Sequence, residues 1–297
     1  MELALVYRKL GKDDFKVLRV LDSLLGRYEY VPLDIIERRS ALPPLRLTRA
    51  LDRLSKVKAI VRRPTPKVSY RITYIGLDLL AVYSLSRKDA IAFLGTKIGT
   101  GKESEIYIAK DSSGRLLAIK FYKIGRVSFQ KVKRVRQYLV DEPNWMIRSK
   151  IAAEREFKAL KDLSKYTDFV PKVYAWDRHA VVMDYIKGIE LYRYKVALKP
   201  ESILLKILDV LRKAYLNVGI VHGDLSEYNI VVSIEGDEEV PYIIDWPQYV
   251  YRDDPQHEVY LRRDVEHLLK FFKRRYRITI DVERAIRYVR GEEESIS

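Results

Sequence analysis

Residues 221–229 read Val-His-Gly-Asp-Leu-Ser-Glu-Tyr-Asn, which is the most specific pattern in the sequence. Asp224 and Asn229 stand five residues apart (224 to 229) after an apolar run, a spacing typical of the catalytic loop of phosphoryl-transfer enzymes. In such a loop the Asp accepts or orients a hydroxyl proton, and the Asn binds a metal ion. A capping Asp or a turn Asn would explain either residue alone, so the assignment depends on the rest of the chain.

A second acidic position follows the loop in the stretch Ile243-Ile244-Asp245-Trp246-Pro247. An ionised carboxylate at the end of a buried strand is costly unless a cation meets it. Mg²⁺ held by Asn229 and Asp245 supplies that cation, with Mn²⁺ as an alternative metal. We therefore assign Asn229 and Asp245 as metal ligands, and Asp224 and Asp245 as catalytic residues. Lys120, on a strand described next, is the third catalytic residue that we assign.

Upstream, a glycine turn and a lysine-bearing strand predict a phosphate site. The stretch 98–107 carries Gly99 and Gly101, whose backbone allows a polyphosphate to approach closely, but it does not have the Walker A pattern. Lys120 ends the apolar run 117–119, and a point cation there suits the α- and β-phosphates, although a surface lysine is the commoner case. The carboxylate partner expected for Lys120 is Glu156, with Glu154 as second candidate.

Ala180–Met183 is predicted to be a buried strand, and the residues after it a hinge whose backbone meets adenine. The alternative, an ordinary end of a core strand, is compatible with this role. The nucleotide-binding residues expected from the turn, the lysine strand and the hinge are Gly99, Gly101, Lys102, Ser104, Lys120, Glu156, Met183, Tyr185 and Ile186.

The first ninety residues predict a winged helix. Two short amphipathic helices precede a third that Pro43-Pro44 opens, and strand-like runs at 59–61 and 68–72 follow. In a winged helix the third helix and the wing contact nucleic acid, and here both carry cations. A protein-binding winged helix with a solvated basic face is the alternative. The candidate nucleic-acid residues are Arg46, Arg49, Arg53, Arg62 and Arg63.

Composition limits the function further. The 297 residues include 56 Lys and Arg against 41 Asp and Glu, a net charge of +15, which favours phosphate-bearing partners, although a thermophile's surface would look similar. The absence of cysteine excludes disulfides and thiolate chemistry and fits a reducing compartment. No signal peptide or apolar run of about 20 residues is present, so we expect a cytoplasmic protein with no membrane partner.

The four motifs together resemble the RIO family of atypical serine/threonine protein kinases, and within it the second subfamily, which has an N-terminal winged helix, in its archaeal-type short form. The resemblance covers essentially the whole chain. It implies an ATP- and Mg²⁺-dependent, non-specific serine/threonine kinase or ATPase that acts on the small ribosomal subunit precursor. It also implies that Lys120 and Ser104 bind phosphate, that Asp224 is the base, and that Asn229 and Asp245 bind the metal.

Departures from ordinary protein kinases leave the protein substrate open. Ser104 replaces the third glycine, no Gly follows Asp245, and few residues remain after it for a peptide-binding lobe. One hypothesis is that Asp245 itself accepts the phosphoryl group, in an ATPase-like cycle. Two other functions are kept as alternatives: a small-molecule phosphotransferase of the aminoglycoside or choline kinase type, and an RNA-binding assembly factor with a weak kinase core.

The expected architecture is α+β: an N-terminal winged helix at 1–90, followed by a bilobal protein-kinase-like domain with a reduced C-lobe at 91–297. Its N-lobe would span 91–184, its hinge 183–187 and its C-lobe 188–297. A cation-rich segment from Lys120 to Leu139 is interpreted as an RNA-contacting loop, or equally as a solvated helix face.

Overall fold

The computed structural model describes residues 2–125 and 144–296, which fold as two compact units. The first unit holds the described residues up to Glu154 together with Tyr174–Met183, and the second holds Arg155–Val173 and the described residues from Asp184 onward. None of the boundaries between the units falls near residue 90. The limits of 1–90 and 91–297 therefore stay predictions. Residues 126–139 of the predicted segment 120–139 lie outside the described residues.

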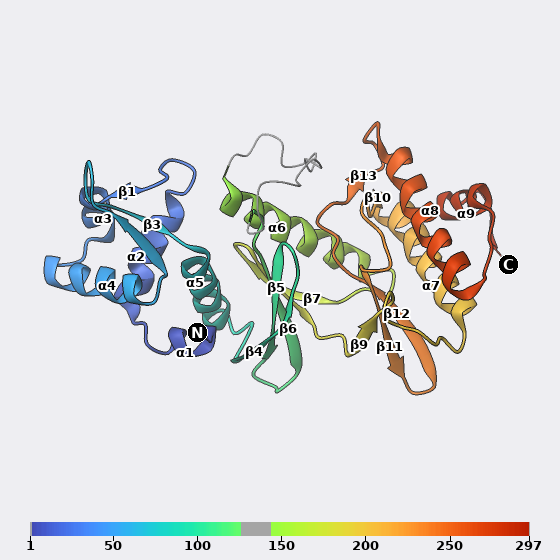
Figure 1. Cartoon of the computed structure of the whole chain (residues 1–297), viewed down its shortest axis with the longest axis horizontal. Coiled ribbons are helices and arrows are strands. Elements are labelled where there is room, and N and C mark those ends of the chain that lie inside the picture. The colour runs from blue at the N-terminus through green and yellow to red at the C-terminus, as the bar shows by residue number, and fades with distance from the viewer. Residues whose placement is uncertain (1, 126–143, 297) are drawn as a thin grey trace. The chain divides into compact units, whose positions relative to one another are not determined.

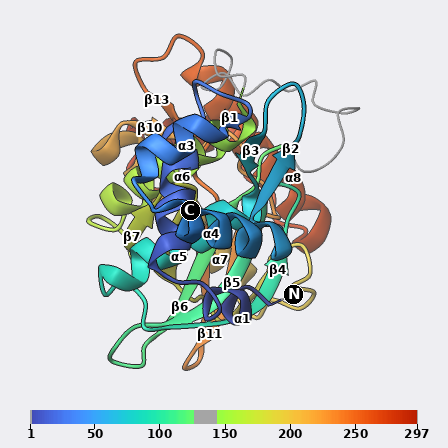
Figure 2. The same ribbon diagram turned by 90° about the vertical axis from the view of Figure 1, so that its left-hand side faces the viewer.

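The first unit begins with helices followed by a hairpin, in the order predicted from the sequence (Figure 1). Helix α4 shows why: Pro44 opens it, and Leu47, Leu51 and Leu54 bury one face. Figure 2 looks onto these helices and onto the antiparallel sheet of order β1-β3-β2. The elements are α1 (Leu3–Tyr7), α2 (Lys12–Ser23), β1 (Val31–Pro32), α3 (Leu33–Ser40), α4 (Pro44–Lys56), β2 (Ile60–Arg63), β3 (Ser69–Ile72) and α5 (Tyr74–Arg87).

A five-stranded sheet of order β4-β5-β6-β8-β7 completes the first unit, with the first turns of α6. The apolar core runs from the N-terminal helices into this sheet, because Leu80 and Ile91 belong to the same buried cluster as Ile119 and Val182. The helical domain and the sheet are thus one packed body. The elements are β4 (Phe93–Thr100), β5 (Ser104–Lys110), β6 (Leu116–Tyr122), α6 (Trp145–Leu163), β7 (Val173–Asp177) and β8 (Ala180–Asp184).

The second unit contains the rest of α6 from Arg155 onward and two small antiparallel sheets, of order β12-β11-β9 and β10-β13. Helices α7, α8 and α9 of this unit lie near one another in Figure 1. Helix α7 is α-helical from Pro200 to Lys213 and then continues as one π-helical turn, which Gly219 ends with φ of 76°. The elements are β9 (Gly188–Glu190), α7 (Pro200–Lys213), η2 (Ala214–Val218), β10 (Ile220–Val221), β11 (Ile230–Glu235), β12 (Glu238–Ile243), β13 (Val250–Tyr251), α8 (His257–Tyr276) and α9 (Val282–Arg290).

Candidate active site

The predicted catalytic loop connects β10 to β11, and a buried carboxylate on α8 holds its backbone. Asp264 accepts hydrogen bonds from the amide of Gly223 at 2.7 Å and from the amide of Leu225 at 3.0 Å. These two amides flank Asp224, so Asp264 fixes the peptide planes on either side of the predicted base. Burial raises the pKa of Asp264 to about 7, although the two backbone hydrogen bonds act in the opposite direction.

Gly223 is required by this arrangement. Its φ is +79°, a left-handed conformation that glycine adopts without strain, and a Cβ added there would lie 2.6 Å from the carbonyl oxygen of Gln248. The guanidinium of Arg263 donates to the carbonyl oxygen of Gly223. The loop is therefore packed against the segment that follows Asp245.

The side chain of Asp224 is oriented within the same unit. Gln248 donates from Nε2 to Asp224 Oδ2 at 3.0 Å, which fixes the direction of the carboxylate. Asn229 donates from Nδ2 to the carbonyl oxygen of Asp224 at 2.8 Å. Since that bond uses the amide nitrogen of Asn229, its Oδ1 is the atom that remains suited to a cation.

Asn229 directly precedes β11, and Asp245 comes two residues after the end of the adjacent strand β12. Strand β11 pairs with β12 so that Ile230 is opposite Ile243, and the amide of Ile244 donates to the carbonyl oxygen of Asn229 at 2.9 Å. Asp245 has φ of +65°, a conformation that is uncommon outside glycine but that Asp adopts more readily than most residues. One carboxylate and one amide oxygen suit Mg²⁺, which takes few protein ligands and fills its other positions with phosphate or water. Within the described residues there is no cluster of three or more His, Cys, Asp or Glu side chains that could hold a metal, so substrate or water would have to complete this coordination.

The glycine turn and Lys120 belong to the first unit. The turn closes β4 onto β5 through a 2.8 Å hydrogen bond from the amide of Gly101 to the carbonyl oxygen of Ser104. A Cβ added at Gly99 would meet only ordinary van der Waals contacts, so packing alone does not require glycine there. Lys120 is buried in β6 opposite Ile106, with its Nζ 4.7 Å from the ring centre of Tyr122.

The remaining predicted nucleotide residues divide between the units. Lys102 is exposed in the turn of the first unit, and Met183 is buried in β8. Tyr185 and Ile186 follow in a stretch without regular structure, and the boundary between the units falls between Met183 and Asp184. Glu156 is buried in α6 and belongs to the second unit, whereas Lys120 belongs to the first. The roles of these residues stay predictions.

Two of the five candidate nucleic-acid arginines contact carboxylates of α2. Arg46 forms two hydrogen bonds with Asp13, at 2.6 and 2.8 Å, and this pairing raises the pKa of Arg46. Arg53 bonds to Asp14, whose side chain is buried, with its Nη2 at 3.0 Å from Oδ1. The other three are exposed residues: Arg49 on α4, and Arg62 and Arg63 on β2, where Arg63 covers the ring of Tyr30.

Sequence reasoning missed Asp264 and the role of Gln248. The signal for Asp264 was available, because this acidic residue lies between Leu261 and Val265 on the apolar face of a helix, where an unpartnered carboxylate would be costly. Gln248 stands three residues after Asp245, but its bond to Asp224 depends on a turn that spacing alone does not define.

Comparison with known proteins identifies the fold as that of a kinase-related family. The RIO domain model matches residues 105–285, and the model "Rio2, N-terminal" matches residues 7–88. The chain is 37% identical over 277 residues to the RIO-type serine/threonine-protein kinase Rio2 of Methanocaldococcus jannaschii, covering 89% of this chain and 99% of that protein. It is 31% identical over 280 residues to the serine/threonine-protein kinase rio2 of Schizosaccharomyces pombe, covering 93% of this chain and 80% of that one.

A solved structure has a similar fold over most of the chain. The crystal structure of the Rio2 kinase-ADP/Mg²⁺-phosphoaspartate complex from Chaetomium thermophilum matches with a TM-score of 0.82 and 29% identity, covering 97% of this chain and 89% of that one. The chain belongs to the RIO family of serine/threonine-protein kinases. Within that family it has the N-terminal domain of the Rio2 kinases, as the sequence motifs predicted. No helix in residues 2–125 and 144–296 is both long and apolar enough to span a bilayer.

Proposed function

We propose that this chain is an ATP- and Mg²⁺-dependent serine/threonine kinase or ATPase that acts in maturation of the small ribosomal subunit. The observation that carries the catalytic part is the loop held by Asp264, because it fixes the backbone on both sides of Asp224 while Gln248 orients the carboxylate. Preorganisation of this kind is expected where the position of a base limits the rate.

Each residue has a separate role in the proposal. The glycine turn, Ser104 and Lys120 bind the phosphates of ATP, while Asn229 and Asp245 hold Mg²⁺, which neutralises charge on those phosphates. Asp224 accepts the proton of the attacking hydroxyl group or water. A small-molecule phosphotransferase is the weaker alternative, because relatives that match 89% and 93% of the chain are named as serine/threonine-protein kinases.

Asp245 is also proposed as a phosphoryl acceptor. In that route the bond from the γ-phosphorus to the bridging oxygen breaks, ADP leaves, and a new P–O bond forms to a carboxylate oxygen of Asp245. Water then hydrolyses the acyl phosphate to inorganic phosphate and restores the carboxylate. The phosphoaspartate in the Chaetomium thermophilum Rio2 complex supports this route.

The ribosomal part of the proposal has its support in family membership and charge. A net charge of +15 favours an RNA-rich partner through phosphate contacts, and we propose that the winged helix contributes some of them. The absence of cysteine fits a cytoplasmic location, which is part of the same proposal.

ATP labelled at the γ-phosphate tests both parts. The protein is incubated with Mg²⁺, with and without small-subunit precursor particles, and the label is traced to solvent, to Asp245 or to serine. We expect Mg²⁺-dependent turnover that the particles change, and a hydroxylamine-sensitive phosphoprotein. Absence of turnover under every condition would contradict the enzymatic proposal. An acid-stable, hydroxylamine-resistant phosphoprotein as the sole labelled product would contradict the route through Asp245.

A further inference from the structure

A chain of buried charged side chains leads from helix α5 to the glycine turn. Lys123, directly after β6, donates from Nζ to Asp78 Oδ2 at 2.7 Å and to Glu105 Oε2 at 2.6 Å. The second oxygen of Glu105 accepts from Lys97 at 2.7 Å, and the second oxygen of Asp78 bonds to Nε2 of His179 at 2.8 Å. This network of charged side chains therefore joins α5 of the N-terminal domain to β4, to β5 and to the residue that follows β6.

The buried charges of this network hold one another in place. Lys123, Asp78 and Glu105 are all buried, so each charge depends on its partners rather than on water. In a buried network, a change at one member alters the energies of the others, because the local dielectric constant is low. The side chain of Glu105 thus cannot move without disturbing Asp78 on another element.

The backbone of Lys123 also holds the turn directly. Its amide donates to the carbonyl oxygen of Glu103 at 2.6 Å, while the amide of Gly101 donates to Ser104 within the turn. Tyr122, the residue before Lys123, lies opposite Ser104 in the β5–β6 ladder. Lys123 therefore contacts the turn through its backbone and through the first acidic residue after Ser104.

From this geometry we infer that Asp78, Lys123 and Glu105 are positioning residues for the glycine turn, so that the N-terminal domain sets the affinity for nucleotide. The inference rests on the proposed function in one respect, namely that ATP phosphates bind at this turn. Its structural part, the dependence of the turn on Asp78, can be tested without nucleotide.

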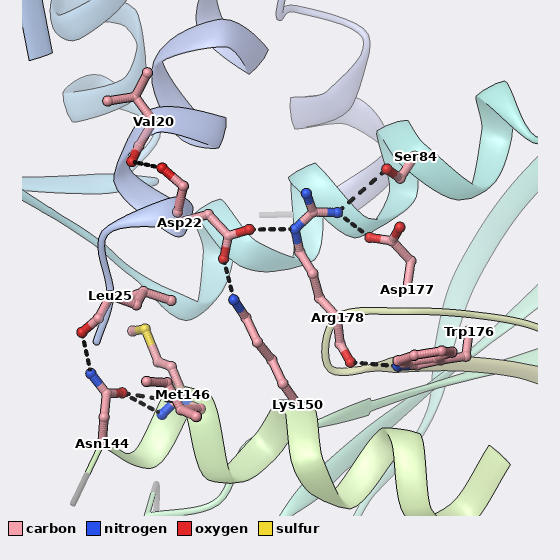
Figure 3. Close-up of polar contacts among 12 residues, drawn as sticks. Val20, Asp22, Leu25, Ser84, Asn144, Met146, Lys150, Trp176, Asp177 and Arg178 are labelled. Carbon is pink, nitrogen blue, oxygen red and sulfur yellow. Dashed lines mark hydrogen bonds and ion pairs between the residues drawn. The ribbon is translucent and has the colours of Figure 1, made fainter. Parts of the chain in front are cut away.

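A second ion-pair cluster provides a matched control (Figure 3). Asp22 on α2 bonds to Lys150 on α6 at 2.6 Å and to Arg178 in the β7–β8 turn at 2.7 Å. Arg178 also reaches Ser84 of α5. This cluster also joins the N-terminal helices to α6 and to the sheet of the first unit. Within the described residues, none of these four side chains forms a hydrogen bond or ion pair with the glycine turn. If a substitution acted only by loosening the packing of the N-terminal helices, a substitution in either cluster should change nucleotide binding to the same extent.

The experiment compares Asp78→Asn with Asp22→Asn in the full chain. Asp78→Asn removes one charge from the network and keeps the size of the side chain. We expect it to raise the KM for ATP about fivefold or more, with little change in kcat, and to speed hydrogen exchange at the amides of Gly101 and Lys123. Asp22→Asn should change neither property, whatever it does to thermal stability.

Glu105→Gln leaves α5 untouched and should give the same rise in KM, which keeps the test valid if Asp78→Asn folds poorly. Unchanged exchange at Gly101 and Lys123 in folded Asp78→Asn protein, or an equal rise in KM in Asp22→Asn, would overturn the inference. A wild-type chain that binds no ATP would contradict the proposed function instead, and faster exchange in Asp78→Asn would still support the positioning role.

Discussion

The amide of Gly223 donates a 2.7 Å hydrogen bond to the carboxylate of Asp264, forty-one residues further along the chain. A second bond, from the amide of Leu225, makes this carboxylate the common acceptor for both sides of Asp224. The base of the proposed reaction is thus held by a helix that sequence motifs did not include in the site.

Asp264→Ala is expected to lower kcat by about a hundredfold, because a misplacement of roughly 1 Å has that effect on a catalytic group. It should also lower the free energy of unfolding by about 1–3 kcal/mol for each buried amide left without an acceptor. Steady-state kinetics and urea unfolding measure the two effects. Glu266→Ala, an exposed change on the same helix, is the control, and wild-type kcat in Asp264→Ala would contradict the role.

The raised pKa of Asp264 predicts a pH dependence of stability. Its ordinary value is 3.8 and its value in the folded protein is about 7, so between these the native state holds a proton that the unfolded chain has released. Stability from this group is therefore present below about pH 4 and is lost as pH rises to about 7, by up to about 4 kcal/mol. Urea unfolding of wild type and Asp264→Asn from pH 4.5 to 7.5 measures it. A stability difference between them that stays constant over this range would contradict the prediction.

Gln248→Ala should reduce kcat about tenfold or more while leaving the KM for ATP nearly unchanged. The lost bond is to a charged group, for which about 1.5–3 kcal/mol is typical, and it orients the proposed base rather than the nucleotide. Gln256→Ala, at the exposed start of α8, serves as the control in the same kinetic assay. A loss seen only in KM would show that Gln248 acts on binding instead.

The arginine pairings predict unequal effects on RNA binding. Arg49 and Arg62 are exposed and form no ion pair or side-chain hydrogen bond within the described residues, whereas Arg46 is held by Asp13. Arg49→Ala and Arg62→Ala should each weaken RNA binding and reduce the slope of log Kd against log salt concentration by about one. Arg46→Ala should have a smaller effect, because Asp13 already neutralises that charge. Equal effects of all three would mean that the pairing with Asp13 opens on binding.

The helices and strands could be predicted because the residues that indicate each one are close together in the sequence. Pro44 and the leucines of α4 define that helix, and apolar runs define the strand that carries Lys120 and the strand that ends just before Asp245. The order of the motifs along the chain then led to the correct family. These features depend on residues within about ten positions of one another, over which spacing is informative.

The supporting contacts could not be predicted, because their members come from distant parts of the chain. Asp78, Glu105 and Lys123 lie on three elements, and nothing in the sequence around Lys123 distinguishes it from other lysines of the basic segment. In the same way, the pairing of Arg46 with Asp13 depends on how α4 packs on α2. A count of charges in the sequence treats Lys123 and Arg46 as solvent-exposed cations. Their carboxylate partners are brought to them only by the packing of the folded protein.

The most direct test of the account is ATP turnover by Asp245→Asn measured across a Mg²⁺ titration, beside wild type and Asp253→Asn as an exposed control. We expect Asp245→Asn to keep its fold by circular dichroism and to lose Mg²⁺-dependent turnover by a hundredfold or more, roughly the loss expected when one key electrostatic contact is removed. Asp253→Asn should show wild-type turnover. Wild-type turnover and an unchanged Mg²⁺ dependence in Asp245→Asn would contradict the assignment of Asp245 as a metal ligand.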